Sequence, residues 1–317
     1  MTWLVTGGAG YIGAHVVRAF RANGIDVVVI DDLSSGHAEF VPEGVPFIEA
    51  SLLDAEAVRR ALTGVTGVVH LAGYKYAGVS VERPLHTYTQ NVTAMVTLLN
   101  EMAAQDIHNI VFSSSAGVYG TPDAELVTED TPTGPQSPYG ETKLIGEWLL
   151  ADQANAVPLK HTSLRYFNVV GSADPKVYDA SPYNLFPIVC NLLSKGEVPS
   201  IYGTDHPTPD GTSVKDYVHV GDLADAHVAA ARALESGKAL APAYNLGSGS
   251  GTSVREIMDA ARRVTGIDFT PGETPRRPGD PSRVVASGEL ATRDLGWKNS
   301  YTVDEMFRSA WEAWPRS

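Results

Sequence analysis

The sequence predicts an α/β fold with a doubly wound parallel sheet and a smaller mixed α/β lobe toward the C-terminus. Three observations support this fold. Short apolar runs alternate with segments of helical periodicity as far as residue 166. The first apolar run ends in a glycine cluster, which is typical of a strand that turns into a helix. Beyond residue 167 proline and glycine become frequent and the regular alternation fades, which indicates a second lobe.

The expected elements follow one another as strand and helix. We expect strands at residues 3–5, 26–30, 67–71, 109–113 and 160–166, and helices at 11–23, 54–62, 90–104 and 139–155. Residues 216–220 and 222–234 indicate a strand and an alanine-rich helix that return to the first domain, with Asp222 as the helix N-cap. Helices at 253–265 and 303–314 belong to the second lobe. The predicted division is therefore 1–167 with 214–239, and 168–213 with 240–317.

The composition excludes several classes of protein. The chain has 317 residues and a net charge of −13, which argues against a surface for nucleic acid or anionic membranes. Cys190 is the single cysteine, so neither an intrachain disulfide nor a cysteine-rich metal site can form. No apolar stretch approaches the roughly 18 residues of a membrane span, and the first residues do not resemble a signal peptide. We therefore expect a cytoplasmic protein.

A glycine-rich turn and an acidic residue predict a dinucleotide site. The pattern G-x-G-x-x-G runs from Gly8 to Gly13, between the first expected strand and helix. Its glycines let backbone amides approach a pyrophosphate at the positive end of a helix. Asp31 ends the second strand, where a carboxylate accepts hydrogen bonds from a ribose diol and repels a 2′-phosphate; the nearest downstream arginine is Arg59. The pattern favours a Rossmann domain that binds NAD.

Tyr139 and Lys143 form a candidate acid–base pair. They are four residues apart at the start of an expected helix and therefore share a face. A nearby ammonium and the positive nicotinamide ring would lower the phenol pKa toward that of a general base. Ser113, Ser114 and Ser115 end the fourth long strand, at the edge of the sheet where ligands bind, and a hydroxyl there could relay a proton. The nine histidines show no metal-ligand spacing, so we expect no metal.

These motifs resemble the extended short-chain dehydrogenase/reductase family, and within it the UDP-hexose 4-epimerases. The resemblance continues through residues 137–140, 184–185, 210–212, 216–220 and 276–280, and so covers nearly the whole chain. It implies an NAD-binding first domain, a nucleotide-sugar-binding second lobe and tightly bound NAD. It also implies interconversion of UDP-galactose and UDP-glucose through a transient 4-keto sugar.

The resemblance also assigns residues. It makes Tyr139 the base for the sugar 4-hydroxyl, Ser115 the group that holds and relays its proton, and Lys143 the group that lowers the phenol pKa and binds the nicotinamide ribose. The implied cofactor residues are Gly7, Gly10, Tyr11, Ile12, Gly13, Asp31, Asp32, Leu33, Ser35, Gly36, Ser51, Leu52, Leu71, Ala72, Gly73, Lys75, Asn91, Ser113, Tyr139, Lys143 and Tyr166. The implied substrate residues are Lys75, Ser115, Tyr139, Phe167, Asn168, Asn184, Leu185, Ser200, Ile201, Tyr202, Lys215, Tyr217, Arg277, Asp280 and Val284.

The resemblance gives five of the substrate residues specific roles. It places Asn168, Lys215 and Arg277 at the UDP diphosphate, Tyr202 on the uracil and Asp280 on the uridine ribose. A sugar held mainly through its nucleotide can turn about the diphosphate and present either face. Tight contacts to UDP and loose contacts to the sugar therefore suit epimerisation.

Four positions depart from the family pattern or bear on specificity. Lys215 stands where arginine is common, which replaces a bidentate fork by a point charge. Ser51 replaces an aspartate that often contacts the adenine, and Gly117 replaces a threonine found in some members. Val284 falls where members restricted to plain hexoses tend to carry tyrosine. Valine leaves more room, so we expect UDP-GlcNAc and UDP-GalNAc to be accepted as well.

Other functions remain alternatives at this stage. A 4,6-dehydratase is disfavoured because no acidic pair follows Ser115. A decarboxylase, a C5 epimerase and a non-catalytic NAD-sensing regulator stay open. The resemblance implies a homodimer formed through the helices at 90–104 and 139–155.

Overall fold

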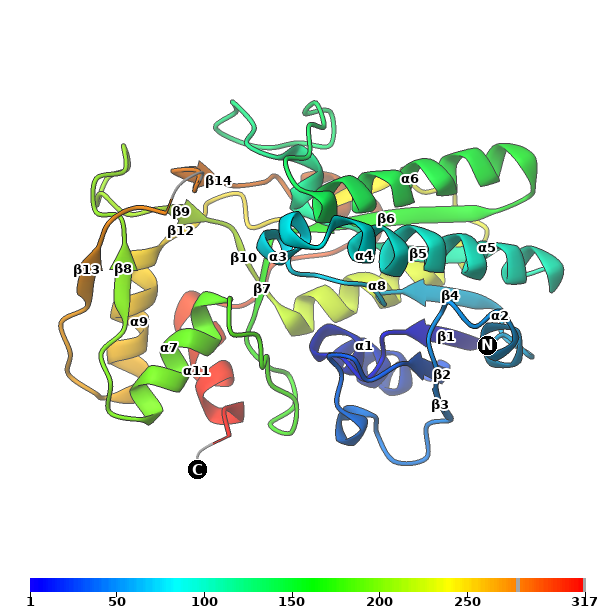
Figure 1. The fold of residues 1–317 in the computed structure, drawn as a ribbon, viewed down its shortest axis with the longest axis horizontal. Helices are drawn as coiled ribbons and strands as arrows, with labels where there is room; N and C mark the ends of the chain where they lie inside the picture. The colour runs from blue at the N-terminus through cyan, green and yellow to red at the C-terminus, as the bar shows by residue number, and fades with distance from the viewer. Residues whose placement is uncertain (278–279, 316–317) are drawn as a thin grey trace.

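Seven parallel strands form the central sheet of the computed structural model, which describes residues 1–277 and 280–315 (Figure 1). Their order is β11-β6-β5-β4-β1-β2-β3. The bounds are β1 (Thr2–Thr6), β2 (Asp26–Asp31), β3 (Phe47–Glu49), β4 (Gly67–His70), β5 (Asn109–Ser113), β6 (Lys160–Tyr166) and β11 (Ala243–Leu246). The chain winds outward from β1 in both directions, so the predicted doubly wound sheet is confirmed. The order reverses between β1 and β4, where ligands bind in such sheets.

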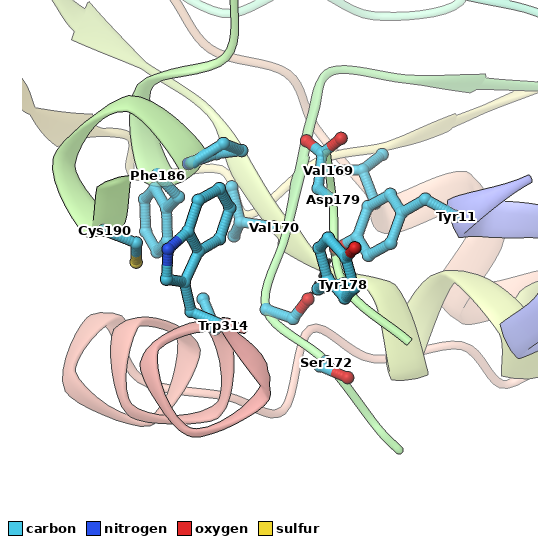
Figure 2. A pocket seen from close by; sticks show the side chains of 12 residues that line it. Tyr11, Val169, Val170, Ser172, Tyr178, Asp179, Phe186, Cys190 and Trp314 are labelled. Carbon is cyan, nitrogen blue, oxygen red and sulfur yellow. Dashed lines mark hydrogen bonds between the residues drawn. The ribbon is translucent and has the colours of Figure 1, made fainter. Parts of the chain in front are cut away.

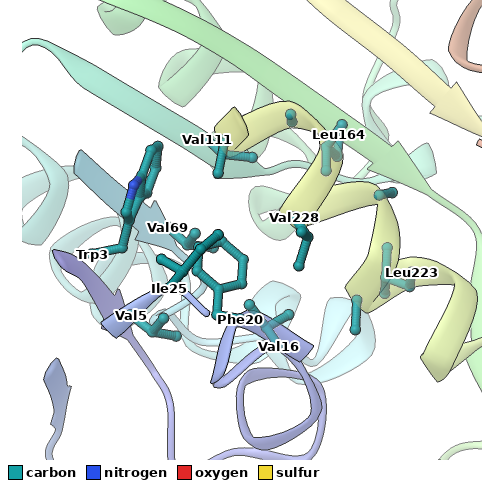
Figure 3. Packing of buried hydrophobic residues seen from close by; sticks show 14 of the residues in the cluster. Trp3, Val5, Val16, Phe20, Ile25, Val69, Val111, Leu164, Leu223 and Val228 are labelled. Atoms are coloured by element: carbon teal, nitrogen blue, oxygen red, sulfur yellow. The ribbon is translucent and has the colours of Figure 1, made fainter. Parts of the chain in front are cut away.

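Helices cover both faces of this sheet because successive strand side chains point to opposite faces. On one face Val5 packs in a cluster with α1 (Tyr11–Ala22) and α8 (Val220–Glu235), which contribute Phe20 and Leu223 (Figure 3). On the other face Leu4 packs in a cluster with α2 (Ala55–Ala61), α5 (Ala94–Ala104) and α6 (Pro138–Ala156). Both faces are therefore buried, and the sheet edge at the carboxyl ends of the strands is left for ligands.

The second lobe has its own core, at the left of Figure 1. The core is built from α7 (Leu185–Ser194), α9 (Val254–Thr265) and α11 (Val303–Ala313). Its buried side chains include Phe186 of α7 and Phe307 of α11. β8 (Ser200–Tyr202) pairs with β13 (Gly272–Thr274), and β9 (Val214–Lys215) lies between β12 (Thr252–Ser253) and β14 (Arg283–Val284). The expected helices at 253–265 and 303–314 are confirmed, whereas the sequence analysis did not identify α7.

Three expectations about the segments around residues 216–246 were wrong. Residues 243–246, placed in the second lobe, form β11, because their buried apolar run pairs in parallel with β6. The expected strand at 216–220 does not join the large sheet: β10 (Tyr217–His219) pairs with β7 (Asn168–Val170). α8 then begins with His219 as its N-cap, whose Nδ1 accepts from the Gly221 N–H at 3.0 Å. Asp222 lies in the first turn, and its carboxylate accepts from the Ser300 N–H at 2.7 Å.

Two short helices and a π-helical turn lie between β4 and α5 in the chain. α3 (Ala77–Glu82) and α4 (Pro84–Tyr88) lead into a π-helical turn at Thr89–Thr93, and α5 begins at Ala94. The helix expected at 90–104 is thus α-helical only from Ala94 onward.

α10 (Glu289–Leu295) packs near β11 and α8. Within the described residues we find no helix that combines the length and the apolar character needed to cross a membrane.

Candidate active site

The predicted site residues gather at the carboxyl ends of three neighbouring strands. The glycine turn follows β1, Leu71 and Ala72 follow β4, and the three serines end β5. The Thr6 Oγ1 accepts from the N–H groups of Leu71 and Ala72, both at 3.2 Å, and so joins the first two strand ends. This arrangement brings the glycine turn and the three serines to one edge of the sheet, where ligands bind in such folds.

The glycine turn is shaped for an anion. A Cβ at Gly13 would overlap the carbonyl oxygen of Gly7, and Gly7 itself has a φ of 72°, which favours glycine. α1 then starts at Tyr11 with no side-chain cap and no acidic residue in its first turn. Its first N–H groups therefore have no side-chain acceptor and face the end of the turn, as a pyrophosphate requires.

Asp31 ties the end of β2 to this turn. Its Oδ2 accepts from the Ala9 N–H at 3.0 Å and its Oδ1 from the Leu33 N–H at 2.9 Å. Burial raises the pKa of the carboxyl, and these two backbone donors oppose that shift. A carboxylate oxygen accepts two hydrogen bonds, so each retains capacity for one ribose hydroxyl. The turn and Asp31 together fit an adenosine dinucleotide.

α6 carries the candidate acid–base pair. The helix starts beside Ser137, whose Oγ accepts from the Gly140 N–H at 3.2 Å. One turn separates Tyr139 from Lys143, and the Lys143 Nζ lies 5.8 Å from the centroid of the Tyr139 ring. The ammonium donates to the Ser113 carbonyl oxygen at 2.8 Å, which fixes it at the end of β5. Burial lowers the pKa of Lys143 to about 8, with the Glu147 carboxylate acting against the shift.

Ser115 completes the pair. Its Oγ accepts from the Gly117 N–H at 3.1 Å, and its side chain lies close enough to the Tyr139 phenol to favour the ionised form of that group. Burial raises the pKa of Tyr139 and the Ser115 hydroxyl opposes that shift, so the net lowering of this pKa that we expected from Lys143 is not observed. A Cβ at Gly117 would lie 3.4 Å from the Ser115 Oγ and 3.8 Å from the Tyr139 Cδ1. Glycine at this departure from the family pattern therefore leaves space beside both hydroxyl-bearing residues.

Ser113 is held by a histidine that the sequence analysis did not identify. The Ser113 Oγ lies 2.8 Å from the His227 Nε2, and the His227 Nδ1 lies 2.8 Å from the Leu223 carbonyl oxygen. Because a carbonyl only accepts, Nδ1 carries the proton and Nε2 accepts from Ser113. Burial lowers the pKa of His227 to about 4, so the ring is neutral. A lone histidine in an alanine-rich helix gave no pattern by which to find it.

Asn91 links the loop after β4 to the catalytic helix. It lies on the π-helical turn, a feature common at functional sites. Its Oδ1 accepts from the Tyr74 N–H at 2.6 Å, and its Nδ2 donates to the Tyr74 carbonyl at 3.0 Å and to the Thr142 Oγ1 at 2.8 Å. The amide of this expected cofactor residue is therefore engaged with protein groups.

Tyr11 contributes to the site through its backbone. Its side chain lies beside Val169 and Tyr178 on one side of a small pocket, and Phe186 and Trp314 line the other side (Figure 2). Its hydroxyl donates to the Gly171 carbonyl at 2.6 Å. The ring thus ties the first domain to the second lobe, while the N–H groups at the start of α1 remain at the turn.

The residues expected at UDP lie in the second lobe as two contacting pairs. The Arg277 guanidinium lies 4.2 Å over the ring of Tyr202, which ends β8. The Lys215 Nζ donates to the Asp280 Oδ1 at 2.8 Å and to the Pro281 carbonyl at 2.7 Å. Burial lowers the pKa of Lys215, and Asp280 opposes that shift. The Pro278-Gly279 step of this motif lies outside the described residues.

Other expected contacts are placed less directly. Asn168 donates through Nδ2 to the Asp216 carbonyl at 2.8 Å, and Val284 pairs with Lys215 between β14 and β9. The side chains of Ile201 and Tyr217 are buried in the second lobe's core, and Leu52 is buried beneath the large sheet. Only the backbone of these three could face a ligand.

Comparison with known proteins identifies the family of this chain. Residues 3–247 match the NAD dependent epimerase/dehydratase family. The chain is 40% identical to the UDP-glucose 4-epimerase of Corynebacterium glutamicum, covering 98% of this chain and 95% of that protein.

Two solved structures share the fold over nearly the full length of both chains. UDP-glucose 4-epimerase from Brucella ovis in complex with NAD has a TM-score of 0.94 and 37% identity, covering 98% and 97% of the two chains. The enzyme from Bifidobacterium longum in complex with NAD⁺ and UDP has a TM-score of 0.89 and 36% identity, covering 99% and 98%. The chain therefore belongs to the NAD dependent epimerase/dehydratase family, and within it to the UDP-glucose 4-epimerases.

Proposed function

We propose that this chain is an enzyme that uses tightly bound NAD to interconvert UDP-galactose and UDP-glucose at carbon 4 of the sugar. The observation that carries the proposal is the cluster of Ser115, Tyr139 and Lys143 at the end of β5, on the same sheet edge as the glycine turn and Asp31. Residues 1–167, 220–239 and β11 would form the NAD-binding domain. The remaining residues would bind the nucleotide sugar.

Tyr139 would take the proton of the sugar 4-hydroxyl, directly or through the Ser115 hydroxyl. The Lys143 ammonium, held by the Ser113 carbonyl, stabilises the phenolate by its charge. When bound, NAD supplies the acceptor and then the donor of the hydride at carbon 4. After the ketone has turned, Tyr139 returns the proton to the new alkoxide, and the phenolate is restored for the next substrate.

The second lobe would hold UDP and leave the sugar free to turn. An aromatic ring has two faces, so Arg277 on one face of Tyr202 leaves the other for uracil. The Lys215 ammonium has three N–H donors, and two are already used by Asp280 and Pro281. One donor is therefore left for a diphosphate oxygen, where an arginine would offer a fork.

The same site would also accept the N-acetylated sugars. Val284 is a partly exposed residue at the edge of the second lobe, paired with Lys215, and its side chain is smaller than tyrosine. We expect kcat/KM for UDP-GalNAc to be comparable to that for UDP-galactose. A Val284→Tyr variant should lose UDP-GalNAc conversion and keep UDP-galactose conversion. A preference of wild type for plain hexoses by about four powers of ten, or about 5.5 kcal/mol, would contradict this proposal.

The main experiment uses the purified protein without added NAD. Incubation with UDP-galactose, followed by anion-exchange chromatography, should show UDP-glucose. Tyr139→Phe removes the proton acceptor and should lower kcat by about 10²–10⁴-fold while the nucleotide sugar still binds. Wild-type protein that converts no UDP-hexose, even after NAD is supplied, would overturn the proposed function in favour of another nucleotide sugar or a sensor.

We also infer that the protein is a homodimer in the cytoplasm. The dimer would form through exposed apolar side chains of the NAD-binding domain. Trp148 on α6 is 57% exposed and Val96 on α5 is 39% exposed, on the two helices that the family resemblance assigns to a dimer. Exposed apolar side chains are typical of an interface where they form a patch, and these two would lie in it. Light scattering coupled to size exclusion should therefore give twice the mass of 33.8 kDa.

A further inference from the structure

Three tyrosines form a row of ring contacts between the two lobes. The Tyr74 and Tyr76 rings, in the loop after β4, meet edge to face with centroids 5.6 Å apart. The Tyr76 ring meets Tyr183 of the second lobe at 5.1 Å and 65°. Tyr183 comes just before α7, so this contact joins segments more than 100 residues apart in the sequence.

The loop that carries Tyr76 is fixed to the start of the catalytic helix. Asn91 hydrogen-bonds both backbone groups of Tyr74 and also the Thr142 hydroxyl of α6. On the far side of Tyr76, the Ser80 Oγ accepts from the Tyr139 N–H at 3.1 Å. Tyr76 is therefore held next to the first turn of α6, which contains the proposed base.

Tyr183 is held just as firmly from the other lobe. Asp179 accepts from the Ser181 N–H at 3.0 Å and from the Asn184 Nδ2 at 2.7 Å, and the Ser181 Oγ accepts from the Tyr183 N–H at 3.3 Å. After burial, the Asp179 charge is the next cause that raises the pKa of Tyr76, so the carboxylate lies close to that phenol. The contact between Tyr76 and Tyr183 therefore connects the surroundings of the proposed base with Asn184, which the resemblance places at the substrate.

The contact can open. The Tyr183 side chain is 58% exposed and meets Tyr76 through a single edge-to-face pair, which is a weak interaction. A nucleotide sugar that enters between the lobes only has to separate these rings, while both backbones stay anchored. Nothing else in the proposed proton transfer uses these two side chains.

We propose that Tyr76 and Tyr183 close the passage between the two lobes during turnover and keep the 4-keto sugar in place until it is reduced. The inference rests on the proposed function. In the first half-reaction the 4-hydroxyl loses its proton to Tyr139 and carbon 4 loses its hydride to NAD, which leaves a ketone bound through UDP. If the ketone escapes at that point, the enzyme is left with reduced cofactor and cannot complete the cycle.

The test measures how often the ketone escapes. Tyr76→Ala, Tyr183→Ala and the double variant are supplied with UDP-galactose. Released UDP-4-ketohexose is trapped with borodeuteride and quantified by mass spectrometry, and absorbance at 340 nm follows the reduced cofactor that remains. Ketone released per epimerisation should rise about threefold to tenfold in each alanine variant, as loss of one aromatic contact allows. The double variant should match either single variant, because the Tyr76–Tyr183 contact is lost in all three.

The controls separate closure from structure. Tyr76→Phe and Tyr183→Phe keep the rings and should release ketone at the wild-type ratio. Tyr183 is exposed, so its truncation tests the idea without disturbing a core, even if Tyr76→Ala folds poorly. An unchanged ratio in Tyr183→Ala overturns the inference and leaves the proposed function standing. A wild-type protein that neither epimerises nor reduces its cofactor with UDP-galactose overturns the proposed function itself.

Discussion

At the scale of single residues, Lys143 and His227 differ in how well the sequence predicts them. Lys143 was predictable because Tyr139 lies one helical turn earlier, and a fixed spacing survives folding. His227 reaches Ser113 only because α8 packs against the sheet beneath β5. No local spacing encodes that contact. Pairs within one element were thus predictable, whereas contacts between distant elements required the structure.

The pKa of Lys143 leads to a prediction at this scale. Burial lowers it to about 8, so raising the pH through 8 in the free enzyme removes the charge that stabilises the Tyr139 phenolate. We expect wild-type kcat/KM for UDP-galactose to fall above about pH 8. Lys143→Met should be much less active at pH 7 and should lack this alkaline limb in a profile from pH 6 to 10. A variant with the wild-type limb would show that another group is responsible.

At the scale of elements, apolar runs predicted the strands that are buried on both faces, and the prediction failed where a local signal conflicts with the fold. The strands at 109–113 and 160–166 match β5 and β6 to the residue. α7 was missed because Pro187 indicates a break, yet this proline lies in the first helical turn, where no intrahelical N–H bond is lost. β11 was misplaced because only its pairing with β6 shows which sheet it joins.

The glycine turn leads to a prediction about an element. In Gly13→Ala the new methyl group would overlap the Gly7 carbonyl oxygen. That oxygen is a backbone atom, so relieving the overlap would require a shift of the glycine turn itself. We expect the variant to retain little NAD on purification and to have a lower Tm. Gly134→Ala is the matched control, because a Cβ there meets nothing within 4 Å. Equal NAD content in the two variants would contradict the role given to the turn.

At the scale of the whole molecule, buried histidine rings make the stability of the fold sensitive to acid. His15 joins α1 to the 171–174 loop through its bond to the Ala173 N–H at 3.1 Å, and His219 stacks on Tyr301 before α8. His70 lies under the sheet edge, with its Nδ1 2.8 Å from the Thr6 Oγ1. These rings, like His227, are neutral groups inside the fold. Charging any one of them would place an unpaired charge among its present partners.

This burial fixes the sign of the pH dependence of stability. It lowers the pKa of His15, His219 and His227 to about 4 and that of His70 to about 3. Unfolded histidines bind protons near pH 6.5, so between pH 6.5 and 4 the unfolded chain binds more protons and the free energy of unfolding falls as the pH falls. Each buried ring contributes a slope of up to about 1.4 kcal/mol per pH unit.

Urea denaturation at pH 7, 6 and 5 measures this slope. His227→Gln removes one titrating ring and should make the free energy of unfolding less steep in pH, whatever its effect on stability at pH 7. His108→Gln, at a partly exposed ring, is the control and should keep a slope closer to that of wild type. A change in packing shifts stability equally at every pH, whereas a lost proton site also changes the pH dependence, so the slope reports the buried ring. If the free energy of unfolding of the wild type stays constant from pH 7 to 5, the four histidine rings are not held in the neutral form by burial in solution.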